Sequence, residues 1–239
     1  MAGQQESLAR IYIVWVRHGS YQHIIQGISH QKQEDGTENH QYDVAASFRK
    51  SCQLSGDNFA GGQLAAEKLA DLGCRNVAFL RTGASLTNEP NKRKAGFENG
   101  CLSRSLPYEM KILNDGDSLE EFDAFLTKHI QNGRLTFDGI FCVTDSLAYY
   151  ILKVLKRLNQ RVPEDVQLIG FDGTRHFGVQ DYVCSTIVQP VAEIAEMCVA
   201  LLLQENMSVK PPLVCLPVSY AHGGTTAETP GAANHSEQP

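Results

Sequence analysis

The stretch from residue 137 to residue 190, FDGIFCVTDSLAYYILKVLKRLNQRVPEDVQLIGFDGTRHFGVQDYVCSTIVQP, decides the fold of this chain. Within it, residues 140–143 and 166–171 are short and apolar, which is typical of buried strands. The segment 146–158 between them has apolar residues at helical spacing. A strand–helix–strand unit crosses over with a right hand, so we expect its two strands to be parallel.

Polar residues stand where each of these two strands ends. Thr144 and Asp145 follow the first strand, and Asp172 ends the second. The carboxyl ends of parallel strands meet at one edge of a sheet, and open α/β folds bind their ligands there. We therefore expect these three side chains to line a cleft.

The segments on either side of this unit continue the alternation of strand and helix. Strands are expected at 11–16, 76–80, 108–113 and 213–218, and helices at 59–72, 90–103, 118–131 and 191–203. This alternation predicts an α/β fold with a mostly parallel sheet and helices on both faces. Residues 17–49 are polar without clear periodicity and are interpreted as a loop, and residues 221–239 as a disordered tail.

Composition limits the classes of partner. The 239 residues carry a formal net charge of -6 with scattered Lys and Arg, so DNA binding by this chain alone is not expected. The polar N-terminal segment 1–10 lacks the apolar stretch of a signal peptide, and no apolar run is long enough to span a bilayer. We therefore expect a cytoplasmic protein with no membrane partner.

The seven cysteines, at positions 52, 74, 101, 142, 184, 198 and 215, lack the spacing of metal ligands. Their odd number, and the apolar runs around Cys142, Cys198 and Cys215, favour thiols that act as small buried hydrophobes in a reducing compartment. The sequence therefore predicts no metal site and no cofactor.

Seven short motifs follow one another in a characteristic order. They are DNFAGG at 57–62, KRKAGF at 92–97, DGI at 138–140, TD at 144–145, VPEDV at 162–166, IGFD at 169–172 and TIVQP at 186–190. Together they resemble the effector-binding domain of LacI/GalR-type transcriptional repressors, and the resemblance covers about residues 52–220.

This resemblance implies a two-lobed fold of the periplasmic-binding-protein type, with a sugar or a nucleotide base bound between the lobes. The family's three chain crossings imply a first lobe of residues 11–82 and 189–205, and a second lobe of residues 83–188 and 206–220. A family member also begins with a helix-turn-helix and further strands, and neither is visible before residue 11. The first lobe is therefore expected to be incomplete.

The resemblance also implies ligand roles for particular residues. Arg93 stands at the arginine of the family motif and Asp172 at a ligand carboxylate, whereas by residue type alone they are a solvated helix charge and a turn cap. One of Thr144 and Asp145 is expected to face the ligand, and the other to cap the following helix. Such planar polar groups suit sugar hydroxyls.

Two further polar residues are weaker candidates for ligand contacts. Gln189 lies at the second expected crossing, where it either closes over a ligand or bridges the lobes through its backbone. Asn88 precedes the arginine helix and either reaches a ligand hydroxyl or serves as a turn residue. Phe97 and Phe171 are expected to belong to the core because each lies on an apolar face.

The resulting hypothesis is the ligand-sensing domain of a repressor, with a carbohydrate rather than a purine as its effector and with no enzymatic activity. The family's homodimer would place Tyr149, Tyr150 and Val154 at an interface, unless they belong to the core. The alternatives are the sugar-binding protein of a transport system and a truncated fragment without function. An enzyme that uses Asp145 and Asp172 lacks any supporting catalytic motif.

Overall fold

The computed structural model describes residues 12–18, 21–27, 54–83, 88–174, 183–202 and 214–228 of the chain. The chain divides into two compact units. The larger unit consists of Asp57–Gln189 and Pro217–Pro239, and the smaller unit of Met1–Gly56 and Pro190–Leu216.

A six-stranded sheet forms the centre of the larger unit, with the strand order β12-β10-β9-β8-β4-β5. Neighbouring strands are parallel except for β12, which pairs antiparallel with β10. The strands are β4 (Val77–Arg81), β5 (Tyr108–Ile112), β8 (Gly139–Cys142), β9 (Gln167–Asp172), β10 (Ser185–Val188) and β12 (Ser219–Ala221). The predicted α/β fold with a mostly parallel sheet is confirmed.

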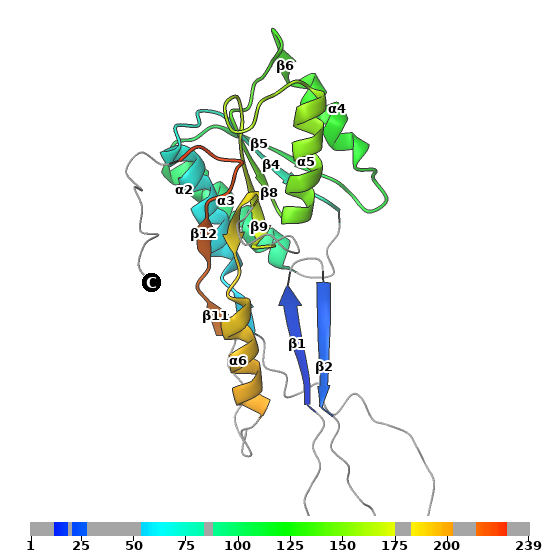
Figure 1. Ribbon diagram of the computed structural model, residues 1–239, viewed down its shortest axis with the longest axis vertical. Coiled ribbons are helices and arrows are strands. Elements are labelled where there is room, and N and C mark those ends of the chain that lie inside the picture. Colours follow the sequence, from blue (N-terminus) through cyan, green and yellow to red (C-terminus); the bar gives the residue numbers. More distant parts are fainter. Residues whose placement is uncertain are drawn as a thin grey trace, which may run out of the picture. The chain divides into compact units, whose positions relative to one another are not determined.

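Helices cover both faces of this sheet. Figure 1 shows α2 and α3 on one face and α4 and α5 on the other. The helices are α2 (Asn58–Asp71), α3 (Glu89–Ser103), α4 (Glu120–Lys128) and α5 (Asp145–Arg157), and a two-stranded hairpin of β6 (Ile130–Gln131) and β7 (Arg134–Leu135) follows α4. The predicted strand–helix–strand unit is therefore β8, α5 and β9.

Aromatic side chains fill the core beneath α2 and α3. Phe97 of α3 stacks on Phe141 of β8 with ring centroids 5.3 Å apart, and Phe79 of β4 lies 5.6 Å from Phe97. Phe171 of β9 continues the group at 6.4 Å from Phe141. Phe97 and Phe171 are fully buried, so their expected place in the core is confirmed.

Glycines allow α2 and α3 to pack closely against each other. A Cβ atom on Gly96 would lie 1.9 Å from the carbonyl oxygen of Phe59, and one on Gly62 would lie 2.0 Å from the carbonyl oxygen of Arg93. Real Cβ atoms do not approach backbone that closely, so each position requires glycine. This contact fixes the backbone of Arg93 against α2.

The smaller unit contains a four-stranded sheet with the order β11-β3-β1-β2. Its elements are β1 (Tyr12–His18), β2 (Tyr21–Gly27), β3 (Leu54–Gly56), α6 (Val191–Leu202) and β11 (Val214–Leu216). Ile194 and Cys198 of α6 pack on Leu54 of β3. β3 pairs parallel with both β1 and β11, whereas β1 and β2 are antiparallel.

The segment 17–49 differs from the loop expected there. β1 extends to His18, and Tyr21–Gly27 forms β2. The two strands pair, so their backbone groups hydrogen-bond to each other, although the residue pattern of this segment did not indicate a strand. Residues 28–49 and the polar segment 1–10 lie outside the described residues.

The lobe boundaries that the family resemblance implied stay a prediction. The first division between the two compact units follows Gly56, because β4 hydrogen-bonds to β5 and β8, and because α2 packs on α3. The last division follows Leu216. Residues 221–228 are described and partly buried, since Thr225 and Thr226 both hydrogen-bond to Ser185.

The cysteine prediction holds for most of the described residues. Five described cysteines are buried, whereas Cys215, expected to be buried, is exposed on β11. Burial raises the pKa of the Cys74, Cys101 and Cys184 thiols to about 12. The described helices include none that is long and apolar enough to cross a bilayer.

Candidate functional site

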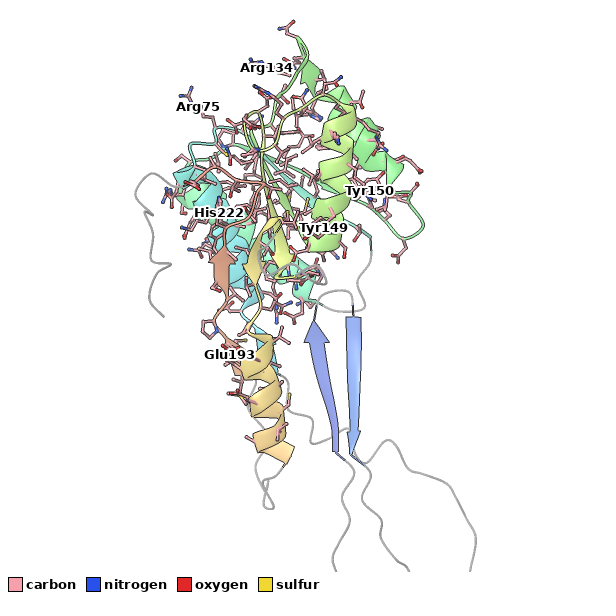
Figure 2. The ribbon with its side chains drawn as sticks, viewed as in Figure 1. Arg75, Arg134, Tyr149, Tyr150, Glu193 and His222 are labelled. Atoms are coloured by element: carbon pink, nitrogen blue, oxygen red, sulfur yellow. The ribbon has the colours of Figure 1, made fainter. Side chains whose placement is uncertain are left out.

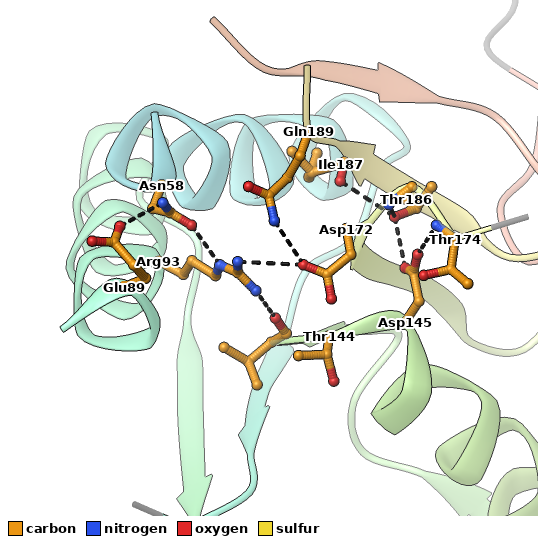
Figure 3. Close-up of polar contacts among 12 residues, drawn as sticks. Asn58, Glu89, Arg93, Thr144, Asp145, Asp172, Thr174, Thr186, Ile187 and Gln189 are labelled. Atoms are coloured by element: carbon orange, nitrogen blue, oxygen red, sulfur yellow. Dashed lines mark hydrogen bonds and ion pairs between the residues drawn. The ribbon is translucent and has the colours of Figure 1, made fainter. Parts of the chain in front are cut away.

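Arg93 lies at the centre of a buried polar cluster at the carboxyl edge of the six-stranded sheet (Figure 3). Only 3% of its surface is exposed, although it carries a full charge. Its Nε atom donates a 2.7 Å hydrogen bond to Oδ1 of Asn58, and its Nη1 atom donates a 2.6 Å hydrogen bond to the carbonyl oxygen of Val143. These two bonds hold the guanidinium plane between α2 and the end of β8.

Asp172 supplies the negative charge beside this guanidinium. Its Oδ1 atom lies 3.3 Å from Nη2 of Arg93 and accepts a 2.9 Å hydrogen bond from Nε2 of Gln189. Both contacts are drawn in Figure 3. The sheet thus brings together three of the expected ligand residues, Arg93, Asp172 and Gln189, from α3, β9 and the end of β10.

The backbone of Asp172 adopts a strained conformation. Its φ angle of 120° lies in a region that residues other than glycine rarely adopt. Surrounding contacts have to hold such a residue in place, and strain of this kind is concentrated at binding and catalytic sites. Here the hydrogen bond from Gln189 and the ion pair with Arg93 provide that restraint.

The ring of Phe171 forms a floor under the charged cluster. The guanidinium carbon of Arg93 lies 3.7 Å from the centroid of this ring, which is within the range of a cation–π contact. Burial lowers the pKa of Arg93, while Asp172, Glu89 and Asp145 oppose that shift through their negative charges. Together they keep a buried cation compatible with the core.

Asn58 and Glu89 extend the cluster towards the start of α3. The Nδ2 atom of Asn58 donates a 2.5 Å hydrogen bond to Oε2 of Glu89, whose other oxygen accepts from Nζ of Lys92 at 3.0 Å. Asn58 was not a predicted site residue. Asp57 caps α2 by accepting from the backbone N–H of Ala60, and this leaves the Asn58 side chain for Arg93.

Asp145 lies apart from the ion pair and binds other partners. Its Oδ1 atom accepts a 2.6 Å hydrogen bond from the Thr186 hydroxyl, and its Oδ2 atom accepts one of 2.6 Å from the Thr174 backbone N–H. Burial raises the pKa of Asp145 to about 7, and these two hydrogen bonds limit the rise. Asp145 therefore ties the start of α5 to β10 and to the turn after β9.

Thr144 and Asn88 both occupy helix starts. The Thr144 hydroxyl caps α5 by accepting from the backbone N–H of Leu147 at 3.3 Å. Asn88 precedes α3 without a side-chain cap bond, and its Oδ1 atom accepts a 3.1 Å hydrogen bond from Nδ2 of Asn91. Of the Thr144 and Asp145 pair, Thr144 is thus the helix cap.

The residues named for an interface on α5 have different surroundings, and Figure 2 labels two of them, Tyr149 and Tyr150. Val154 is buried in the core, whereas Tyr149 and Tyr150 are partly exposed. The Tyr150 hydroxyl donates a 2.9 Å hydrogen bond to Asp123 of α4, and Arg157 also pairs with this carboxylate. Val154 is therefore a core residue.

The cluster offers recognition groups rather than reactive ones. A guanidinium, a carboxylate and two amides carry planar sets of donors and acceptors over an aromatic ring, an arrangement that suits a polyhydroxylated ligand. Within the described ranges, no group of three or more His, Cys, Asp or Glu residues is placed to hold a metal ion.

Comparison with known proteins gives the family of this chain. The profile described as "Periplasmic binding protein-like domain" matches residues 66–226, which is more than half of the chain. The sucrose operon repressor of Pediococcus pentosaceus is 35% identical over 182 residues, covering 71% of this chain and 52% of the repressor. The ribose operon repressor of Halalkalibacterium halodurans is 26% identical over 152 residues, covering 64% of this chain and 45% of the repressor.

A solved structure agrees with these matches. The crystal structure of a LacI-family transcriptional regulatory protein from Corynebacterium glutamicum has a TM-score of 0.60 and 26% identity, covering 73% of this chain and 68% of that protein. The chain spans about half the length of the curated relatives it matches. The resemblance to LacI/GalR-type effector domains is confirmed. The chain therefore belongs to the family of periplasmic binding protein-like domains.

Proposed function

We propose that this chain is the ligand-sensing domain of a LacI-type transcriptional repressor and that its effector is a sugar. The observation that carries the proposal is the buried ion pair of Arg93 and Asp172, joined by Gln189 and set over the ring of Phe171. Two curated relatives carry the names of sugar operon repressors, and this supports a carbohydrate in preference to a purine.

In this proposal Arg93, Asp172 and Gln189 exchange paired hydrogen bonds with adjacent sugar hydroxyls. Their charges strengthen these bonds, and the ring of Phe171 supports the guanidinium of Arg93 through a cation–π contact. Thr144 and Asp145 shape the same edge of the sheet, with Thr144 fixing the start of α5 and Asp145 fixing the turn after β9. Asn88 contributes at the start of α3.

The proposed output is a shift in a conformational equilibrium and not a chemical reaction. A sugar that binds one conformation better than another shifts the population by its difference in affinity. We place the protein in the cytoplasm, as a homodimer whose DNA contacts are made by a separate helix-turn-helix, since this chain has a net charge of -6. The chain is not an enzyme in this proposal.

Calorimetric titration of the chain with sucrose, D-fructose, D-glucose and D-ribose tests the proposal. We expect one of them to bind, and we expect Gln189→Leu and Asp172→Asn to weaken its affinity at least tenfold. Arg104→Gln is the control. Arg104 directly follows α3, the helix that carries Arg93, but it forms an exposed ion pair with Asp71. Absence of binding by these four sugars and by their phosphates to the folded chain would contradict the proposal.

A further inference from the structure

A second buried arginine stands at the carboxyl edge of the same sheet. Arg81 is the last residue of β4, and only 9% of its surface is exposed. Its Nη1 atom donates a 2.5 Å hydrogen bond to Oδ1 of Asn91. Its Nε atom is buried without a hydrogen-bond partner. Among the side-chain atoms of the described residues, no other is in this state.

Arg81 also has no counter-ion in the described part of the chain. None of the ion pairs found there includes it, whereas Arg93 is paired with Asp172. Glu89 is the acidic residue in the first turn of α3, and its two carboxylate oxygens are bound by Asn58 and Lys92. Burial lowers the pKa of Arg81, and no carboxylate acts against that shift.

A buried cation without a partner is unfavourable for the folded protein. Desolvation of a guanidinium costs several kcal/mol unless an anion or a full set of hydrogen bonds compensates for it. The hydrogen bond to the neutral amide of Asn91 offsets part of this cost, whereas the buried Nε–H group of Arg81 has no hydrogen-bond partner. Residues that lower stability in this way are typical of binding sites.

The position of Arg81 adds a second source of positive potential. Its guanidinium contacts Asn91, which lies in the first turn of α3, a helix of 15 residues. The N-terminus of a helix favours anions through its aligned peptide dipoles. Asn88 precedes this turn without a side-chain cap bond, and its amide adds hydrogen-bonding capacity at the same place.

We propose that Arg81 and the first turn of α3 bind the phosphate group of the effector, so that the sugar sensed by this chain is a phosphorylated one. This inference rests on the proposed function, since it names the class of sugar. Arginine suits the task because its planar fork donates two parallel hydrogen bonds to phosphate oxygens. A sugar that carries only neutral hydroxyls would not need a second buried arginine in addition to Arg93.

The test compares sugars with and without phosphate on the same chain. D-fructose, D-fructose 6-phosphate, D-glucose, D-glucose 6-phosphate and inorganic phosphate are each titrated calorimetrically into the chain and into its Arg81→Gln variant. We expect a phosphorylated sugar to bind at least tenfold more tightly than its neutral parent, and the preference to disappear in Arg81→Gln. Arg104→Gln, which removes an exposed guanidinium next to α3, should retain it.

Thermal unfolding without ligand gives a second measurement that separates a binding role from a structural one. We expect Arg81→Gln to melt at the same temperature as the parent chain or above it, because the variant removes an unpaired buried charge. A clear fall in melting temperature would mean that Arg81 supports the fold, and the inference would be overturned.

The outcomes distinguish this inference from the proposed function. Equal binding of a sugar and its phosphate, or a phosphate preference that persists in Arg81→Gln, overturns the phosphate site and leaves sugar sensing intact. Binding of inorganic phosphate that depends on Arg81, without binding of any sugar, supports the anion site and overturns sugar sensing. Absence of binding by all five compounds overturns the phosphate site, and absence of binding by sucrose and D-ribose as well overturns sugar sensing.

Discussion

Asn58 and Arg93 lie 35 residues apart in the chain, and Oδ1 of Asn58 accepts a 2.7 Å hydrogen bond from Nε of Arg93. The same amide donates to Glu89, so one side chain orients both a cation and an anion. The guanidinium plane of Arg93 is thus set by a residue that is the first of α2 and lies outside the predicted ligand set.

Replacement of Asn58 by Ala should weaken sugar binding about tenfold without unfolding the chain. A hydrogen bond to a charged group contributes about 1.5 kcal/mol, and its loss lets the guanidinium rotate. Calorimetry on Asn58→Ala measures the effect. Asn99→Ala is the control, because Asn99 also links α3 to α2, through Gln63, but in an exposed pair. Equal loss of affinity in both variants would contradict the positioning role of Asn58.

Replacement of Asp172 by Asn should destabilise the chain by about 3 kcal/mol, because it leaves the buried charge of Arg93 without its ion-pair partner. Asparagine has nearly the same shape as aspartate, so the backbone strain at this position is similar in both chains and does not account for the loss. Urea unfolding measures the change. Arg161→Gln breaks the exposed ion pair with Asp165 and should cost less than about 1 kcal/mol. Similar losses in the two variants would contradict the buried character of the Arg93 pair.

The stability of the chain should fall as pH rises through the range in which Asp145 ionises. The folded-state pKa of about 7 exceeds the ordinary value of 3.8, so between these values the folded chain keeps a proton that the unfolded chain has lost. This proton stabilises the folded state at low pH, and the contribution disappears above pH 7. Melting temperatures from pH 4 to pH 8 test this, with Asp145→Asn expected to flatten the decline. If the melting temperature of Asp145→Asn fell with pH as steeply as that of the parent chain, the decline would come from another titrating group.

Replacement of Gly96 by Ala should destabilise the chain by about 3 kcal/mol, because the added Cβ would collide with the backbone of α2. Circular dichroism during thermal unfolding measures the loss. Gly224→Ala is the matched control, since a Cβ there would meet the carbonyl oxygen of Val183 at an ordinary 3.5 Å. A small effect at Gly96 would show that the two helices can separate without loss of stability.

Cys215 should react with a thiol reagent before the other described cysteines do. It is exposed, whereas Cys74, Cys101, Cys142, Cys184 and Cys198 are buried. Burial also raises the pKa of several of these thiols, which removes the reactive thiolate. Peptide mapping after brief labelling identifies the modified residues, and Cys215→Ser should remove that product. Rapid labelling of Cys142 would contradict its burial.

Local patterns were sufficient to predict the strand–helix–strand unit that carries Asp172. The patterns of 140–143, 146–158 and 166–171 predicted β8, α5 and β9 within a residue or two, because the two strands are buried along nearly their whole length and the helix buries one apolar face. The family motifs then selected Arg93 and Asp172, which the structure brings together.

Contacts between distant segments were beyond the reach of local patterns. The role of Asn58 depends on Arg93 on another helix, and the closeness of those helices depends on Gly62 and Gly96 in combination. The strand β3 was not predicted because it has only three residues, too few to show a period. Arg81 was missed because an arginine that ends a strand resembles any surface charge in the sequence.

The division of the chain gives Gln189 a second significance. It holds Asp172 through its side chain and is also the last residue of the larger unit before Pro190 opens the smaller one. Proline fixes its own φ angle, so the backbone directly after Gln189 has one rotation fewer than an ordinary residue would give it. The side chain that restrains Asp172 therefore belongs to the residue at which the chain leaves the larger unit.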